Sequence, residues 1–275
     1  MFLLFWFSTT LLVADEKPKV DQKTEKKAVK NWQSLYQKSA DLYMAGKIDE
    51  AISVAEDAMK LASSNLVASL KQIGSYYRSE AEYEKAEPIY TRLLQHQETI
   101  LGLDHPDLVE TIHELARVYQ SQNKFTKAEA LHKRGIKILE KSKENSPDLG
   151  YKIFELGALY EFQKLYDKSA TQYLRALKIW EGASEINEQD ILQAVGSLAR
   201  VYRNGKKYAK AEPYYKRMIA MTEKAYGKKS PYIIYSLEQL KKLYELMEKD
   251  GEVKLLNSRI SKIRLLQKPK KKKKF

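Results

Sequence analysis

Cysteine is absent from the 275 residues of this chain. Disulfide bonds and cysteine-based metal sites are therefore excluded, and no thiol is present to accept the lipid of a lipoprotein. The absence is compatible with an oxidising compartment, although it does not establish one.

The residues on which most catalytic sites depend are also sparse. The four histidines show no i,i+4 pairing and no acidic motif of the metalloprotease type; they are His96, His105, His113 and His132. No glycine-rich phosphate loop is present, because Gly182, Gly205 and Gly227 stand singly at expected helix ends or turns. We therefore predict a protein that is not an enzyme and that holds no cofactor and no metal ion.

Long hydrophobic runs are missing as well. The apolar segment at residues 2–14 would extend about 20 Å as a helix, too short for a hydrocarbon core of about 30 Å. Its length fits a signal peptide, so we predict one over residues 1–14, with cleavage before Asp15 and export to the periplasm or the exterior. However, no Lys or Arg precedes the segment, and Leu12 stands where a small residue is preferred. An uncleaved anchor or a misassigned start therefore stays open, which would leave the chain membrane-anchored or cytoplasmic.

Acidic residues are too few to balance the basic ones, and the excess is uneven. Of the net charge of +13, six lysines after Gln267 supply +6, and residues 15–30, with six lysines against four acids, supply +2. We predict a disordered charged linker over residues 15–30 and a disordered Lys-rich tail over residues 264–275. The +5 left for residues 31–267 does not by itself indicate a nucleic-acid partner.

A repeated pattern fills the rest of the chain. Residues 115–140 predict two amphipathic helices with a turn at 122–124, and the opening LARVY at 115–119 has counterparts elsewhere. These counterparts are at 73–77, 156–160, 198–202 and 240–244, so that successive copies start 42, 41, 42 and 42 residues apart. A fixed period with a helix–turn–helix in each unit predicts an all-α solenoid of about six repeats over residues 31–263.

The repeats share particular residue types at fixed positions. One position on the second helix holds a small residue, which is expected where the two helices touch. Alanine stands there in three copies, at Ala86, Ala128 and Ala211, and Ser169 replaces it in a fourth. The last repeat departs from the pattern, with Lys241 and Val253 in place of small residues, which is typical of a degenerate capping repeat.

The pattern resembles the tetratricopeptide repeat (TPR). Three copies match it closely: Gly74/Tyr77/Tyr83/Ala86, Ala116/Tyr119/Phe125/Ala128 and Ala199/Tyr202/Tyr208/Ala211. The 42-residue spacing and the phrase LGLDHPDLVETIHELARVY are similar to the kinesin-light-chain type of this repeat. The resemblance implies a right-handed superhelix whose first helices line a concave groove that holds extended peptides or short helices.

Counting helical faces from the expected core residues places one set of side chains on the groove side. The predicted partner-binding residues are Lys71, Arg78, His113, Arg117, Tyr151, Arg200, Arg203, Asn204, Tyr235 and Lys242. The four arginines present planar donor forks that suit carboxylates of a partner. An alternative interpretation is that they pair with nearby acids of the chain itself and leave a neutral face; these acids are Glu110, Glu114, Glu155 and Glu161.

We therefore expect a non-enzymatic scaffold that binds a protein or peptide, with acidic groups among the candidates for its partner. One alternative is an accessory subunit of an envelope enzyme or secretion complex that uses the convex face and the termini. Minor alternatives are an atypical enzyme site at a repeat junction and nonspecific attraction of anionic polymers or lipids to the Lys-rich tail, at roughly 1 kcal/mol per charge. The sequence predicts no specific nucleic-acid partner and no membrane span, and it leaves the oligomeric state undetermined.

Overall fold

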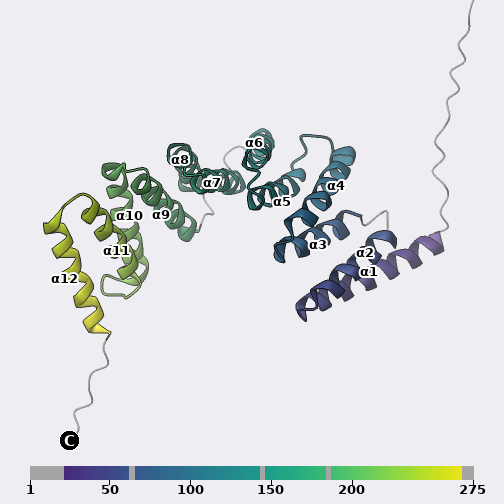
Figure 1. Ribbon diagram of the computed structural model, residues 1–275, viewed down its shortest axis with the longest axis horizontal. Helices are drawn as coiled ribbons and strands as arrows, with labels where there is room; N and C mark the ends of the chain where they lie inside the picture. The colour runs from purple at the N-terminus through teal and green to yellow at the C-terminus, as the bar shows by residue number, and fades with distance from the viewer. Residues whose placement is uncertain (1–21, 62–65, 143–145, 184–186, 268–275) are drawn as a thin grey trace, which may run out of the picture. The chain divides into compact units, whose positions relative to one another are not determined.

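The computed structural model (Figure 1) describes residues 22–61, 66–142, 146–183 and 187–267. The described residues form twelve α-helices and no strand. The predicted signal peptide at 1–14, and most of the predicted Lys-rich tail, lie outside the described residues.

The helices follow one another as six helix–turn–helix units. They are α1 (Gln22–Met44), α2 (Ile48–Leu61), α3 (Leu66–Ser79), α4 (Tyr83–Leu101), α5 (Leu108–Ser121), α6 (Phe125–Ser142), α7 (Pro147–Phe162), α8 (Tyr166–Gly182), α9 (Glu188–Asn204), α10 (Tyr208–Tyr226), α11 (Ile233–Leu246) and α12 (Asp250–Leu266). The all-α solenoid of helical hairpins predicted from the sequence is confirmed.

The predicted outer boundaries of the solenoid need correction. Helix α1 begins at Gln22, so residues 22–30, expected in a disordered linker, are helical. These residues are mostly Lys, Glu, Gln and Ala, which are strong helix formers, and they run into the first repeat without a Gly or Pro. At the other end, α12 continues to Leu266, three residues beyond the predicted boundary at residue 263.

Each hairpin turn has the same backbone geometry. In the third repeat the N–H of Lys124 donates to the carbonyl of Tyr119 over 2.8 Å, and the N–H of Asn123 donates to that of Gln120 over 3.0 Å. This pair of bonds is the Schellman arrangement, which requires a left-handed residue after the helix. The positive-φ residues at the six turns are Gly46, Ala81, Asn123, Lys164, Lys206 and Glu248.

The chain divides into two compact units, residues 1–76 and 77–275. In the first unit, α1 packs on α2 through fully buried Ala51, Ala55 and Ala58. The Trp32 indole donates a hydrogen bond of 3.0 Å to Ser69 Oγ, and Tyr43 stacks on Tyr76 with ring centroids 4.5 Å apart.

In the second unit, the small position of α4, α6, α8 and α10 is fully buried; the residues there are Ala86, Ala128, Ser169 and Ala211. Where an acid follows this position, it accepts a bond from the next repeat. The Tyr160 hydroxyl donates a hydrogen bond of 2.8 Å to Glu129, and the Tyr244 hydroxyl donates one of 3.1 Å to Glu212. The recurring Ala-Glu dipeptide therefore serves both the hairpin contact and the contact between repeats.

Charge pairs also join neighbouring second helices of the second unit. At one repeated position an arginine binds a glutamate of the preceding repeat; the pairs are Arg134–Glu98, Arg175–Glu140, Arg217–Glu181 and Arg259–Glu223. Each half-exposed pair contributes little by itself, since such pairs are worth about 0–1 kcal/mol.

The last repeat leaves several leucines of its second helix exposed. Helix α12 buries Ile260 and Ile263, whereas Leu255, Leu265 and Leu266 stay exposed.

Among the described helices, none is long and apolar enough to cross a membrane.

The turns generate the first prediction. Lys206 has φ of 58°, a conformation in which a Cβ atom costs roughly 1–2 kcal/mol. Glycine relieves this strain but loses more chain entropy on folding, by about 0.5–1 kcal/mol. We expect Lys206→Gly to raise the free energy of unfolding in urea by about 0.5–1 kcal/mol. Lys206→Ala, which keeps the Cβ atom, should have no effect; an equal gain in both variants would contradict the explanation.

Candidate binding groove

A cavity of about 600 Å³ lies among the helices of the fourth to sixth repeats, within the second unit. Its walls come from the first helices α7, α9 and α11, and α8 and α10 contribute Tyr173, Tyr215 and Met218. Cavities of this size and mixed lining are typical of ligand sites. The first helices of this unit therefore carry a preformed hollow.

One glycine leaves space in the wall. Gly196 lies in the middle of α9 and lines the cavity, where a larger residue would point inward. A Cβ atom built on it would lie 3.4 Å from Met218 Sδ and meets no other atom within 4 Å. The position therefore tolerates a side chain sterically, at the expense of cavity volume.

Three exposed tyrosines surround the hollow. The exposed fractions are 52% for Tyr226, 68% for Tyr232 and 64% for Tyr235, and the rings of Tyr226 and Tyr232 lie 4.8 Å apart. Tyrosine combines a large apolar ring with a polar end, and it is enriched at the centres of protein interfaces. This rim suits contact with another molecule.

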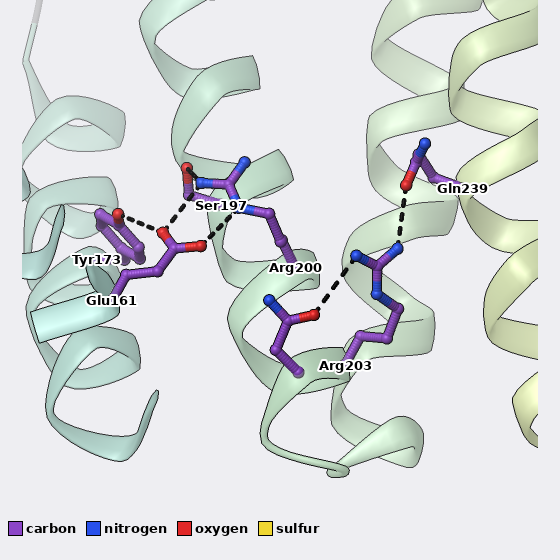
Figure 2. A network of polar contacts seen from close by, with 7 residues as sticks. Glu161, Tyr173, Ser197, Arg200, Arg203 and Gln239 are labelled. Atoms are coloured by element: carbon purple, nitrogen blue, oxygen red, sulfur yellow. Dashed lines mark hydrogen bonds and ion pairs between the residues drawn. The ribbon is translucent and has the colours of Figure 1, made fainter. Parts of the chain in front are cut away.

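Arg200 is held by the chain itself (Figure 2). It donates to Glu161 from Nε over 2.6 Å and from Nη2 over 3.0 Å, while the buried Tyr173 hydroxyl donates to the same carboxylate over 2.8 Å. The bond to Glu161 raises the pKa of Arg200 above its usual value. Burial, followed by the charge of Glu161, raises the pKa of Tyr173. The Arg200–Glu161 pair is thus a fixed, internally neutralised wall.

Arg203 has a different environment. Its guanidinium donates to the amide oxygen of Gln239 over 3.0 Å and to that of Asn204 over 3.4 Å, and it lies 6.0 Å from the ring centroid of Tyr215. These acceptors are neutral, so among the described residues no carboxylate balances its charge.

The same repeat position is neutralised elsewhere. Arg78 occupies the position of Arg203 in the second repeat, and its Nε lies 2.9 Å from Glu114 Oε2. Glu114 in turn occupies the position of Gln239 in the third repeat. Arg78 therefore faces a carboxylate, whereas Arg203 faces the amide of Gln239. This difference leaves the positive charge of Arg203 unbalanced beside the cavity.

The other predicted groove residues fall into two groups. Arg117 lies 3.6 Å from Glu114, and the Tyr151 hydroxyl donates to Asp190 over 2.6 Å. Lys71, Asn204 and Lys242 are exposed. The alternative of internal pairing thus describes Arg78, Arg117 and Arg200, but not Arg203.

His113 requires a correction. It was expected on the open side of α5, but its side chain is buried, with its ring centroid 5.1 Å from that of buried His132 on α6. The helical-face count followed α5 alone, whereas His132 of α6 and Glu155 of α7 also lie against this side chain. The described residues contain no group of three or more His, Asp and Glu side chains arranged to hold a metal ion.

The sequence interpretation missed Tyr226, Tyr232 and Gln239. The first two flank the linker between α10 and α11. Gln239 had a detectable signal, since aligning the repeats shows an amide where the third and fourth repeats have Glu114 and Glu155.

Comparison with known proteins agrees with this architecture. A family model described as Tetratricopeptide repeat matches residues 65–141 and 152–224. Kinesin light chain TPR-like repeats from Podosopora anserina superpose with a TM-score of 0.64 at 19% identity, covering 74% of this chain and 98% of that one. BtubC (BKLC) from P. vanneervenii gives 0.59 at 16% identity, with coverage of 93% and 98%. A TPR protein from Parabacteroides merdae gives 0.60 at 18%, with coverage of 87% and 81%.

These structural likenesses show the fold. No curated protein matches the chain in sequence.

The fixed wall yields the second prediction. Glu161→Gln weakens charged hydrogen bonds from Arg200 and Tyr173, and hydrogen bonds to charged groups contribute about 1.5–3 kcal/mol each. Because glutamine still accepts one bond, we expect a loss of about 1–2 kcal/mol in the free energy of unfolding.

The matched control is Glu245→Gln at the same repeat position. Glu245 is half exposed and lies 3.8 Å from Lys241, so its replacement should cost nothing measurable. Equal losses in the two variants would show that Glu161 has no special role.

Proposed function

Since the chain belongs to the tetratricopeptide repeat family, we propose that it binds a protein partner in the groove of α7, α9 and α11. The segment bound is an extended peptide that presents a carboxylate to Arg203 and an apolar side chain to the neighbouring cavity. The TPR fold in general is a scaffold for protein–protein interaction, and proteins of this kind are typically not enzymes.

The observation that carries the proposal is the charge of Arg203 beside an open, tyrosine-rimmed hollow. An arginine with neutral acceptors keeps its full charge and can form a strong charge-assisted bond with an incoming carboxylate. Arg78, at the equivalent position, is less available to a partner's carboxylate, because its guanidinium is already paired with Glu114.

The arginine is also held in position before any partner arrives. Gln239 and Asn204 hold its guanidinium, and the ring of Tyr215 lies beneath it. Binding therefore costs little side-chain entropy, which is otherwise about 0.5–1.5 kcal/mol for each long side chain that becomes ordered. An apolar side chain entering the adjacent cavity supplies the hydrophobic contribution, at about 25 cal/mol per Å² buried.

The rival interpretations gain less support. Assembly through the second helices gains less support because the arginines at their repeated position are already paired with glutamates of the chain. Attraction of anionic polymers to the Lys-rich tail concerns residues outside the described part of the chain. Export also stays a proposal, which N-terminal sequencing of the protein purified from its host would test.

The third prediction concerns the carboxylate subsite. Selection of a phage-displayed library of random peptides on the full chain should enrich peptides with Asp or Glu near an aromatic or aliphatic residue. Gln239→Glu places a carboxylate against Arg203, as Glu114 does against Arg78, and should weaken the selected peptides about tenfold or more in fluorescence polarisation. Gly196→Leu, which fills the cavity, should weaken them similarly.

Gln95→Glu is the matched control for net charge. Gln95 is exposed on α4, away from the cavity lining, so the same added charge should leave affinity unchanged. Peptides that lack acidic residues, or that bind Gln239→Glu and Gly196→Leu as tightly as the original chain, would overturn the proposal.

A further inference from the structure

A pair of buried histidines lies where α5, α6 and α7 meet. His113 on α5 is 4% exposed and His132 on α6 is 3% exposed, and their rings meet edge to face at 5.1 Å. His113 Nε2 lies 2.6 Å from Glu155 Oε2 on α7. Histidines are seldom this deeply buried, and the groove proposed above does not use either ring.

The two rings differ in their neighbours. His113 has the Glu155 carboxylate beside it. Neither nitrogen of His132 has a hydrogen-bond partner among the described residues. A proton on His132 would therefore be buried and unpaired, a combination with a large desolvation cost.

The surrounding charges reinforce this difference. From α5, His113 and Arg117 act on His132, and from α7, Lys152 and Glu155 do so; Lys152 lies 3.7 Å from Glu155 and 3.6 Å from Glu110. Glu155, the acid with the largest effect on His132, already neighbours both His113 and Lys152. Its carboxylate is therefore already engaged by other groups.

From this geometry we propose that the His113–His132 pair makes the junction of the third and fourth repeats acid-labile, because His132 accepts a proton only when α6 separates from α5 and α7. Arg117 and Tyr151, on the helices that meet there, would then lose their fixed spacing. The device would regulate any surface built on α5 and α7, and it can be tested without a ligand.

The direction of the pH effect follows from linkage. Burial, and next the charge of His113, lowers the pKa of His132 to about 3, against an ordinary value of 6.5 once the ring is exposed. The open state therefore binds one more proton below pH 6.5, and the closed state loses about tenfold in relative population for each further pH unit. Carboxylates with lowered pKa values, such as Glu155, contribute only near and below their ordinary value of 4.5. Between pH 6.5 and 4.5, the effect of His132 can therefore be separated from that of the carboxylates.

The fourth prediction tests this window by hydrogen exchange on the full chain without ligand. After correction for intrinsic exchange rates, protection of the amides of α6 should fall about tenfold per pH unit between 6.5 and 4.5. His132→Leu should remove this pH dependence, because leucine fills the site without binding a proton. His96→Gln, which alters a half-exposed histidine of α4, should keep it.

A second measurement keeps the test decisive if His132→Leu folds poorly. Histidine ring signals of the original chain, followed by NMR from pH 8 to 5, should show that His132 stays neutral. Titration of His132 near 6.5 in the folded chain, or α6 protection that is equally high across the window, would overturn the inference. Neither result would bear on peptide binding at Arg203.

Discussion

The structure depends on the close approach of two helices at one small, fully buried residue, which recurs in the hairpins from α3 to α10. Ala86, Ala128, Ser169 and Ala211 leave no side-chain bulk at the crossing, so the helices approach and the larger residues around them interlock. The three-residue Schellman turn then fixes where the second helix starts. Because both features recur at a fixed period, a local rule repeated along the chain specifies the whole architecture.

This dependence on local rules explains why the fold could be predicted from sequence and parts of the groove could not. The period of about 42 residues and the small position on each second helix were visible in the letters, and the hairpins are confirmed. The start of α1 was missed because residues 22–30 lack the apolar periodicity used to recognise helices, although their helix propensity is high. His113 was misplaced because its burial depends on three helices, which a count along one helix does not include.

The arginines show a subtler limit. Sequence alone left open whether they bind a partner or pair internally, and the structure divides them: Arg78 and Arg200 have a carboxylate of their own, whereas Arg203 has an amide. The distinction rests on one residue, Gln239, whose meaning emerges only when it is compared with Glu114 at the equivalent place. In a repeat protein, the positions most informative about function are therefore those at which one repeat carries a different residue from the other repeats.

The pairing between neighbouring second helices has a consequence for how such a chain can change over time. Every internal repeat from the third to the fifth carries both an arginine directed to the preceding copy and a glutamate directed to the following one, as in Arg175 and Glu181 of the fourth. A repeat gained by duplication would bring one arginine and one glutamate, and a repeat lost by deletion would remove one of each. In both cases the remaining arginines and glutamates could still pair. The length of the array is thus free to vary by whole copies without redesign of the contacts on either side.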